Sequence, residues 1–409
     1  MSMTKRTIAA WVLSVALAVS LTGCWGQQEV GDISIMLGLG IDKTEDGTIS
    51  VTVQVVNPGQ AGGAPGGGTG GKGREYINHE STGKTVEEAL DRLYENSWRP
   101  LFVAHNAVVV FGQAYARDGI DEAIDYFDRN KDFRRIQVFA VTSQDAHRIF
   151  MSKPGIERIN ARAIRELIDL QVERGSSVRS IQLEVTNEIL SPSHSPLMAR
   201  VETDERGELK ADGSGLFRGG KLVGFLGAED TRGALWFRSS IGRTQMFIPC
   251  SDSANPASTS AADTITIGVL NASASVEPVL VSNEPRFTVH VRGAAEIERL
   301  CPSAKPTEEN MQKWRGQLNQ AIGKEMETTM QKLQAQDVDA INFGTRLFQS
   351  NPVAWRKLAE RWSDVFPTVQ VRYDVNLNIL RTGMNSGAST SGYTPESLPP
   401  EHGRKGAVK

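Results

Sequence analysis

The sequence has few cysteines, little net charge and only one long apolar run. Its 409 residues include 3 cysteines, too few for a disulfide-dense scaffold or a four-cysteine zinc site. The formal net charge of −3 lacks the basic excess typical of nucleic-acid binders, so we expect no nucleic-acid partner. Only the N-terminal apolar run approaches the length of a membrane span, which excludes a polytopic membrane protein. The remaining composition, 39% apolar and 23% charged, is typical of globular domains.

Motifs for catalysis, metal binding and cofactor binding are also missing. The six histidines show no H-x-x-x-H or H-x-H spacing, and the G-x-S-x-G nucleophile motif is absent. The glycine run 66–73 has the spacing of a phosphate loop, but Gly73 stands where the magnesium-binding hydroxyl should be. We therefore predict no catalytic, metal-binding or cofactor-binding residues and no enzyme activity. His105, which precedes an apolar strand, is the histidine that most needs inspection.

The N-terminus has the pattern of a bacterial lipoprotein signal. Lys5 and Arg6 precede an apolar stretch of about signal-peptide length, which ends in Leu-Thr-Gly-Cys with the cysteine at Cys24. We predict that residues 1–23 are a signal peptide and that the thiol of Cys24 carries diacylglycerol, which anchors the protein to a membrane. The alternative is a signal anchor in which the cysteine is incidental.

Cys250 and Cys301 remain once Cys24 is assigned to the lipid. Both follow strand-like segments, and an oxidising setting outside the cytoplasm would permit a disulfide between them. Two buried free thiols are the alternative, and the residues leave both states open.

A first domain with strands and helices is predicted over residues 24–150. Residues 33–41 and 48–56 are predicted strands, and the turn-rich sequence DKTEDG between them indicates a hairpin. The Gly-rich stretch 57–73 has no side chains with which to build a core, so we expect a flexible loop there.

The rest of this first domain alternates between helix and strand signals. Thr85 with Glu88 three residues later forms a capping box, which predicts a helix start. Further elements expected here are a strand at 107–111, one helix over 113–130 and a strand at 136–141. Helix 156–174 belongs to a second small domain or linker region, 151–210, whose remainder is polar and rich in turns. The alternation predicts mixed sheets flanked by helices.

A C-terminal α/β region is predicted over residues 211–383. It begins with short strands joined by Gly and Asp turns, at 215–217, 222–226, 234–237, 245–248, 264–270, 276–281 and 286–291. A long helix over about 307–336 follows, then a helix capped by Asn351 with Pro352 at its first position. An alternating strand over 368–380 closes the region. We expect the Gly/Ser/Pro-rich tail, 384–409, to be disordered.

Several short motifs occur in an order that resembles a known family. The start of the predicted mature chain, CWGQQEVGDISIMLGLGIDKTEDGTISVTVQVVNP from Cys24, resembles the Ger(x)C lipoproteins, the C subunits of spore germinant receptors. The similarity continues through STGKT (81–85), RPLFVAH (99–105), FRR (133–135), GLF (215–217), KLVG (221–224), TRG (231–233), DVD (337–339), FG (343–344) and Trp355. It covers about residues 24–383. The sequence departs from the family in its Gly-rich insert and its extended tail.

The resemblance implies an α+β protein of three mixed α/β domains, with antiparallel or mixed sheets flanked by helices, after a lipoprotein signal peptide. It implies a non-catalytic subunit in the spore inner membrane, lipid-anchored on the extracytoplasmic face and assembled with integral A- and B-type subunits. Cys24 is the only functional residue that transfers. The alternative is a solute-binding lipoprotein that delivers a small nutrient to a transporter, which a ligand cleft between domains would favour.

Overall fold

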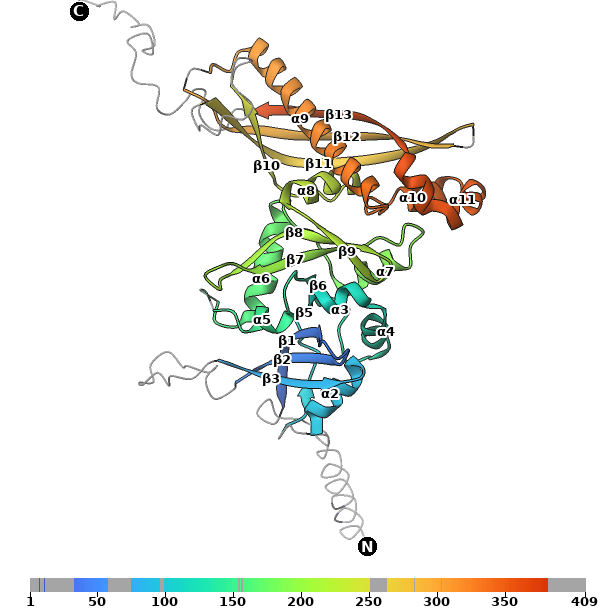
Figure 1. The fold of residues 1–409 in the computed structure, drawn as a ribbon. Helices are drawn as coiled ribbons and strands as arrows, with labels where there is room; N and C mark the ends of the chain where they lie inside the picture. Colours follow the sequence, from blue (N-terminus) through green and yellow to red (C-terminus); the bar gives the residue numbers. More distant parts are fainter. Residues whose placement is uncertain are drawn as a thin grey trace, which may run out of the picture.

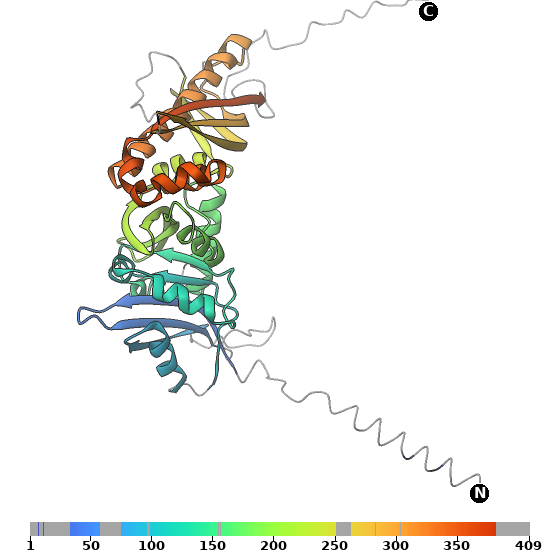
Figure 2. The ribbon, with the colours of Figure 1, turned by 90° about the vertical axis from the view of Figure 1, so that its right-hand side faces the viewer.

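The computed structural model describes residues 33–57, 75–95, 99–153, 155, 157–250, 263–282, 284–302 and 304–381, together with Thr7 and Trp11. Within these residues, two separate sheets with flanking helices lie one beyond the other along the long axis of the molecule (Figures 1 and 2). The predicted α+β class with mixed sheets is confirmed. Cys24, nearly all of the Gly-rich stretch 57–73 and the tail 384–409 lie outside the described residues.

The first sheet has nine strands in the order β3-β2-β1-β5-β6-β7-β8-β9, with β4 paired to β1. Strands β1, β5, β6 and β7 run parallel to one another, and the outer strands pair antiparallel. The strands are β1 (Ser34–Lys43), β2 (Ile49–Val56), β3 (Tyr76–Gly83), β4 (Leu101–Phe102), β5 (Val108–Phe111), β6 (Val138–Val141), β7 (Leu197–Thr203), β8 (Leu209–Arg218) and β9 (Lys221–Leu226). The predicted hairpin of the first two strands is confirmed.

Helices cover both faces of this sheet. The helices are α2 (Val86–Glu95), α3 (Gln113–Asp118), α4 (Asp121–Arg129), α5 (Ala146–Phe150), α6 (Asn160–Glu173) and α7 (Gln182–Ile189). Alternate residues of β5 belong to different cores: Val109 and Phe111 pack with α2, α3 and α4, whereas Val108 and Val110 pack with α5 and α6. Because both faces are buried, the central parallel strands have continuous apolar sequences.

Two helix predictions in this region have different outcomes. The capping box is confirmed in part: the Glu88 amide donates to Thr85 Oγ1 at 3.1 Å, but the Glu88 carboxylate accepts from the Lys84 amide rather than from that of Thr85. The single helix expected over 113–130 is wrong. Gly119 has a φ of 135°, which ends α3, and the Ile120 amide donates to the Gly220 carbonyl on the β8–β9 turn instead of continuing the helix.

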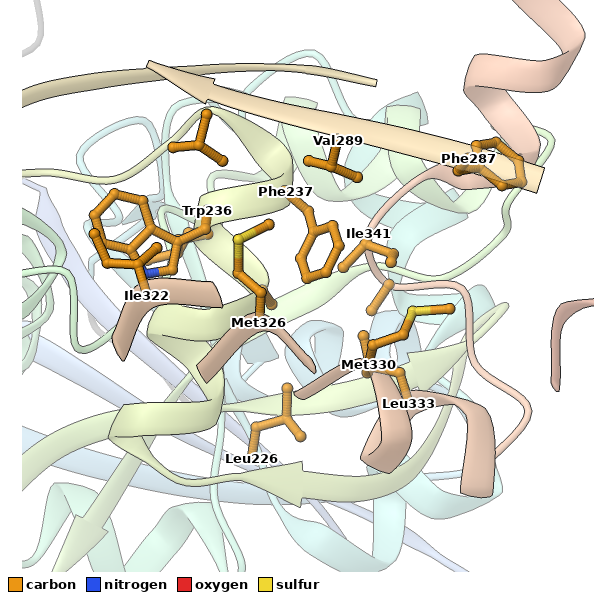
Figure 3. Packing of buried hydrophobic residues seen from close by; sticks show 14 of the residues in the cluster. Leu226, Trp236, Phe237, Phe287, Val289, Ile322, Met326, Met330, Leu333 and Ile341 are labelled. Atoms are coloured by element: carbon orange, nitrogen blue, oxygen red, sulfur yellow. The ribbon is translucent and has the colours of Figure 1, made fainter. Parts of the chain in front are cut away.

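The second sheet has four strands in the order β10-β11-β12-β13. They are β10 (Gln245–Pro249), β11 (Thr264–Val281), β12 (Glu284–Arg299) and β13 (Gln370–Arg381). One face packs on α8 (Ala228–Arg238), α9 (Glu308–Ala335), α10 (Phe343–Ser350), α11 (Pro352–Leu358), α12 (Trp362–Val365) and the 3₁₀ turns η3 (Ala359–Arg361) and η4 (Phe366–Thr368). Figure 3 shows Trp236 and Phe237 of α8 gathered with Met326 of α9 against β12. The opposite face of the sheet is solvent-facing and carries polar side chains together with a few exposed apolar ones, such as Phe247 and Val279, and we call it the outer face.

The long-helix prediction is confirmed, because α9 begins after Thr307, whose Oγ1 accepts from the Asn310 amide. The Asn351 cap with Pro352 at the first position of α11 is confirmed as well. The strand expected over 234–237 is wrong, since these residues form the last turns of α8. The last turns of α8 are buried on nearly all sides, so the sequence there lacks the polar residues at helical spacing that would indicate a helix. The strands expected at 264–270, 276–281 and 286–291 merge into β11 and β12, and α7 lies where we expected a turn-rich segment.

Strand pairing crosses the expected domain boundaries. Strand β7 pairs with β6 on one side and with β8 on the other, so the first sheet continues from residue 34 to residue 226. Strand pairing defines a sheet but does not show which parts of the chain fold independently. The predicted division into domains at about residues 150 and 210 therefore stays a prediction. None of the helices in the described part of the chain combines the length and apolarity needed to cross a bilayer.

Candidate functional site at the junction between the two sheets

The residues singled out from the sequence do not meet in one place. Cys24 lies outside the described residues. Cys250 and Cys301 lie next to each other at the end of the four-stranded sheet, with their Cα atoms 6.4 Å apart. A disulfide can bridge this spacing, and the bond between them stays a prediction. His105 is exposed and lies against the ring of Phe102, with 5.4 Å between the ring centroids. Among the described residues, no group of three or more His, Cys, Asp or Glu side chains could hold a metal ion.

A serine, a histidine and an aspartate do line up on the outer face of the four-stranded sheet. Ser275, His290 and Asp374 lie side by side on three adjacent strands. His290 Nδ1 is 2.7 Å from the Asp374 carboxylate, but its Nε2 lies 3.6 Å from Glu277 Oε2 rather than binding the serine. A serine nucleophile needs a base within hydrogen-bond reach, and here that nitrogen is turned to a carboxylate.

The Asp374 carboxylate is also held by Arg292 on β12. The hydrogen bond from Arg292, followed by that from His290, lowers the pKa of Asp374 to about 2. Ion pairing across β11, β12 and β13 therefore explains why His290 and Asp374 lie side by side, and these pairs stabilise the exposed part of the sheet.

Two sets of polar contacts join distant parts of the chain where the two sheets meet. Glu188, near the end of α7, forms an ion pair with Arg238, at the end of α8. These side chains are only 20% and 13% exposed. Burial lowers the pKa of Arg238 to about 10, so its guanidinium is still charged at neutral pH. A buried pair of this kind is destabilising when one partner is lost, because the other charge stays in the interior.

Asp339, in the turn between α9 and α10, is the centre of a second contact at this junction. Its carboxylate accepts hydrogen bonds from the amides of Phe343 and Gly344 at 2.8 and 2.6 Å. It also accepts from Ser193 Oγ at 2.8 Å and from Trp362 Nε1 at 3.1 Å. Burial raises the pKa of Asp339 to about 6, against the opposing effect of these hydrogen bonds.

Ser193 links this carboxylate to the first sheet. It lies in the loop between α7 and β7, 146 positions before Asp339. Its Oγ also accepts from the Thr345 amide at 3.0 Å. Together with the Glu188–Arg238 pair, these bonds form what we call the junction network. The first region is the nine-stranded sheet with its helices, and the second region is the four-stranded sheet with its helices. The network holds the α7 end of the first region against α8 and α10 of the second.

Local sequence patterns did not predict the junction network. The DVD motif at 337–339 and the FG motif at 343–344 contribute to the family resemblance, but neither motif by itself indicates a contact. Glu188, Ser193 and Arg238 carry no local signal, because their partners lie about 50 to 146 positions away. A helix-end arginine and a loop serine are ordinary surface residues until the fold buries them.

Family models and relatives identify the chain more closely than these contacts do. The model described as spore germination protein N-terminal domain matches residues 26–203. The model described as spore germination B3/GerAC like, C-terminal, matches residues 212–383. The chain belongs to the GerAC family of spore germination proteins. The resemblance to the Ger(x)C lipoproteins is thereby confirmed.

Curated relatives of this family align along nearly their whole length. The putative spore germination protein YfkR of Bacillus subtilis (strain 168) is 27% identical over 375 residues, 90% of this chain and 94% of the relative. Spore germination proteins KC and B3 of the same organism are each 25% identical, covering 94% and 92% of this chain and 98% and 99% of the relatives. This is a spore germination family and not a known enzyme family.

A solved structure shares the fold. The crystal structure of the GerBC protein aligns with a TM-score of 0.52 at 21% sequence identity, covering 84% of this chain and 97% of that one. The arrangement of mixed sheets and flanking helices is therefore that of a known member of the family.

Proposed function

We propose that this protein is a lipid-anchored, non-catalytic subunit of a nutrient germinant receptor. It lies on the extracytoplasmic face of the spore inner membrane and assembles there with integral A- and B-type subunits. Membership of the GerAC family carries this proposal. The predicted lipid attachment at Cys24 supports it.

The tether would place the nine-stranded sheet near the membrane. Strand β1 begins at Ser34, ten positions after Cys24. A chain of that length reaches about 35 Å when fully extended. The folded body thus stays within reach of integral subunits, and the junction network fixes how its two regions are presented to them.

Recovery of partners from spore membranes tests the proposal. The tagged full-length protein is purified from detergent-solubilised spore membranes, and the co-purifying proteins are identified by mass spectrometry. We expect two integral membrane proteins to be recovered with it. Recovery of the lipoprotein alone, under conditions that keep another germinant receptor intact, would contradict assembly.

A Cys24→Ala variant is the control for the lipid. It keeps every described residue, so loss of partners in this variant shows that anchoring is required for assembly. Deletion of the gene should also block germination with particular nutrients while sporulation proceeds normally. Normal germination with every nutrient, in a strain that lacks paralogues, would count against a receptor role.

The solute-binding alternative rests on a separate observation. A hollow lies between the end of α6 and the four-stranded sheet, at the side of the junction. A receptor subunit can also bind a solute, so solute binding in this hollow does not depend on assembly with the other subunits.

A further inference from the structure

A half-open groove of about 630 Å³ lies beside the junction between the two sheets. One wall is the C-terminal end of α6 with the segment that leads into β10. The floor is the outer face of β10, β11 and β12. The lining residues that matter are Arg174, Arg243, Phe247, Gly268, Glu296 and Glu298. A volume of this size is within the range of small-molecule sites.

Tight backbone packing brings the two arginines to the same wall. Gly175 follows Arg174 with a φ of 71°, and a Cβ there would lie 3.1 Å from the Ile241 side chain. A Cβ on Gly242 would lie 2.5 Å from the Glu173 carbonyl oxygen. The end of α6 therefore touches the segment that carries Arg243, which sets both guanidinium groups at the groove.

Neither arginine is neutralised by another described residue. Within the described part of the chain, the side chains of Arg174 and Arg243 have no hydrogen-bond or ion-pair partner, and both residues are exposed. Arg232, also in the lining, differs because its guanidinium binds Glu325 at 2.8 and 3.1 Å. Two unpaired guanidinium groups on one wall can bind a carboxylate through paired N–H donors.

The floor of the groove carries the opposite charge. Glu298 Oε2 accepts from Gln245 Nε2 at 2.6 Å, and Oε1 lies over Gly268, 2.2 Å from where a Cβ of that residue would be. Glu296 lines the groove beside it. The absence of a side chain at Gly268 thus leaves room for a carboxylate oxygen that faces the groove.

We propose that this groove binds a small zwitterionic solute. The carboxylate of the solute lies against Arg174 and Arg243, and its ammonium group lies against Glu298. The exposed ring of Phe247, 61% accessible, supplies an apolar surface for the carbons between the two charges. Arginines on the wall and the Glu298 carboxylate on the floor favour a ligand that carries both charges, since a polyanion would be repelled by the floor.

Calorimetric titration of the full-length protein in detergent tests this assignment. The probes are glycine, 4-aminobutanoate and 6-aminohexanoate, which separate the same two charges by increasing lengths. Butanoate and butylamine are the matched probes, each with one of the charges only. We expect saturable binding of at least one amino acid of the series, and binding of the two single-charge probes at least about tenfold weaker.

Variants locate the site. We expect Arg174→Ala and Arg243→Ala each to weaken binding about tenfold or more, and Gly268→Ala to weaken it by displacing the Glu298 carboxylate. Arg356→Ala, on the exposed side of α11, is the matched control and should bind like the wild type. Unchanged melting temperatures show that each variant is folded.

Three results would overturn the proposal. They are no saturable binding of any amino acid in the series, binding of butanoate as tight as that of the amino acid, and unchanged binding in the folded Arg174→Ala/Arg243→Ala double variant. The titration needs no other subunit. Failure of receptor assembly and failure of solute binding can therefore be told apart.

Discussion

The two sheets of this protein differ in how many of their faces helices cover. Every residue of β5 and β6 in the nine-stranded sheet is buried, because helices pack on both faces. In the four-stranded sheet, β11 alternates between exposed and partly buried residues from Leu270 to Val281, because helices pack on one face alone. A sheet with one open face can contact other molecules without unfolding. We therefore expect solute contacts on the four-stranded sheet, where the groove lies.

The largest expected effect comes from breaking the link between the two regions. Arg238→Ala leaves the Glu188 carboxylate buried without its partner, which should lower the free energy of unfolding by about 3–5 kcal/mol. Chemical denaturation measures the loss. Hydrogen exchange should also show the two regions opening at different denaturant concentrations.

Arg179→Ala is the matched control for this substitution. Arg179, which lies just before α7, forms an exposed ion pair with Glu184 of that helix, and such pairs contribute about 0–1 kcal/mol. If the two substitutions lowered the free energy of unfolding by the same amount, the Glu188–Arg238 pair would contribute no more than an exposed ion pair, which would contradict its role in joining the two regions.

The disulfide should stabilise the second region selectively. A cross-link between cysteines 51 positions apart stabilises by about 4 kcal/mol in the chain-entropy model. Cys250→Ser/Cys301→Ser should therefore destabilise β10 and β11 in hydrogen exchange and leave β5 and β6 protected. Mass spectrometry of the native protein with and without reductant checks the bond, and two free thiols in the native protein would refute it.

A pH titration of stability tests the junction at Asp339. Its pKa is raised from 3.8 in the unfolded chain to about 6 in the fold, so its protonated form is the one that the fold favours. The stability linked to this group is fully present below about pH 3.8 and is lost as the pH rises through 6. Between pH 4 and 7 we expect the unfolding free energy to fall by roughly 2–3 kcal/mol relative to Asp339→Asn.

The asparagine variant lacks this titration but keeps the other shifted carboxyl groups, including Asp42 and Glu325. Their contributions cancel in the difference between the two pH curves. A flat difference curve would mean that Asp339 does not titrate in this range.

The smallest expected effect concerns the helix that covers the second sheet. Thr307→Ala removes the oxygen that accepts from the Asn310 amide at the start of α9, and should cost about 1 kcal/mol. Thr307→Ser keeps that oxygen and is the control. Denaturation of the three proteins checks the ranking, which would be contradicted if the serine variant lost as much as the alanine variant.

Local signals located most of the elements correctly. The Asn351 cap with Pro352 and the long helix over about 307–336 have short-range signals, and each is where the sequence predicted it. Helix α8 was missed because its last turns are buried almost all round and read as a short apolar run. Local patterns fail where an element lies inside the protein, since its residues are then apolar whatever its period.

The candidate sites were much less predictable than the elements. The groove depends on Gly268, a strand residue with no local signal in the sequence. It also depends on two arginines 69 positions apart, which line the same groove only because α6 touches the segment before β10. The predicted lipid site at Cys24 is the reverse case, since its whole signal lies in adjacent residues.

By itself, the sequence determined the elements with a regular period and their caps, together with the family. These depend on residues a few positions apart, whose side chains face the same side of a helix or strand. The tertiary structure alone decided the strand order, the capping of α5 by Asp42 from β1, more than 100 positions away, and the burial of the Glu188–Arg238 pair. Such contacts follow from the packing of whole elements, because an ion pair or cap between distant segments has no period that a sequence can display.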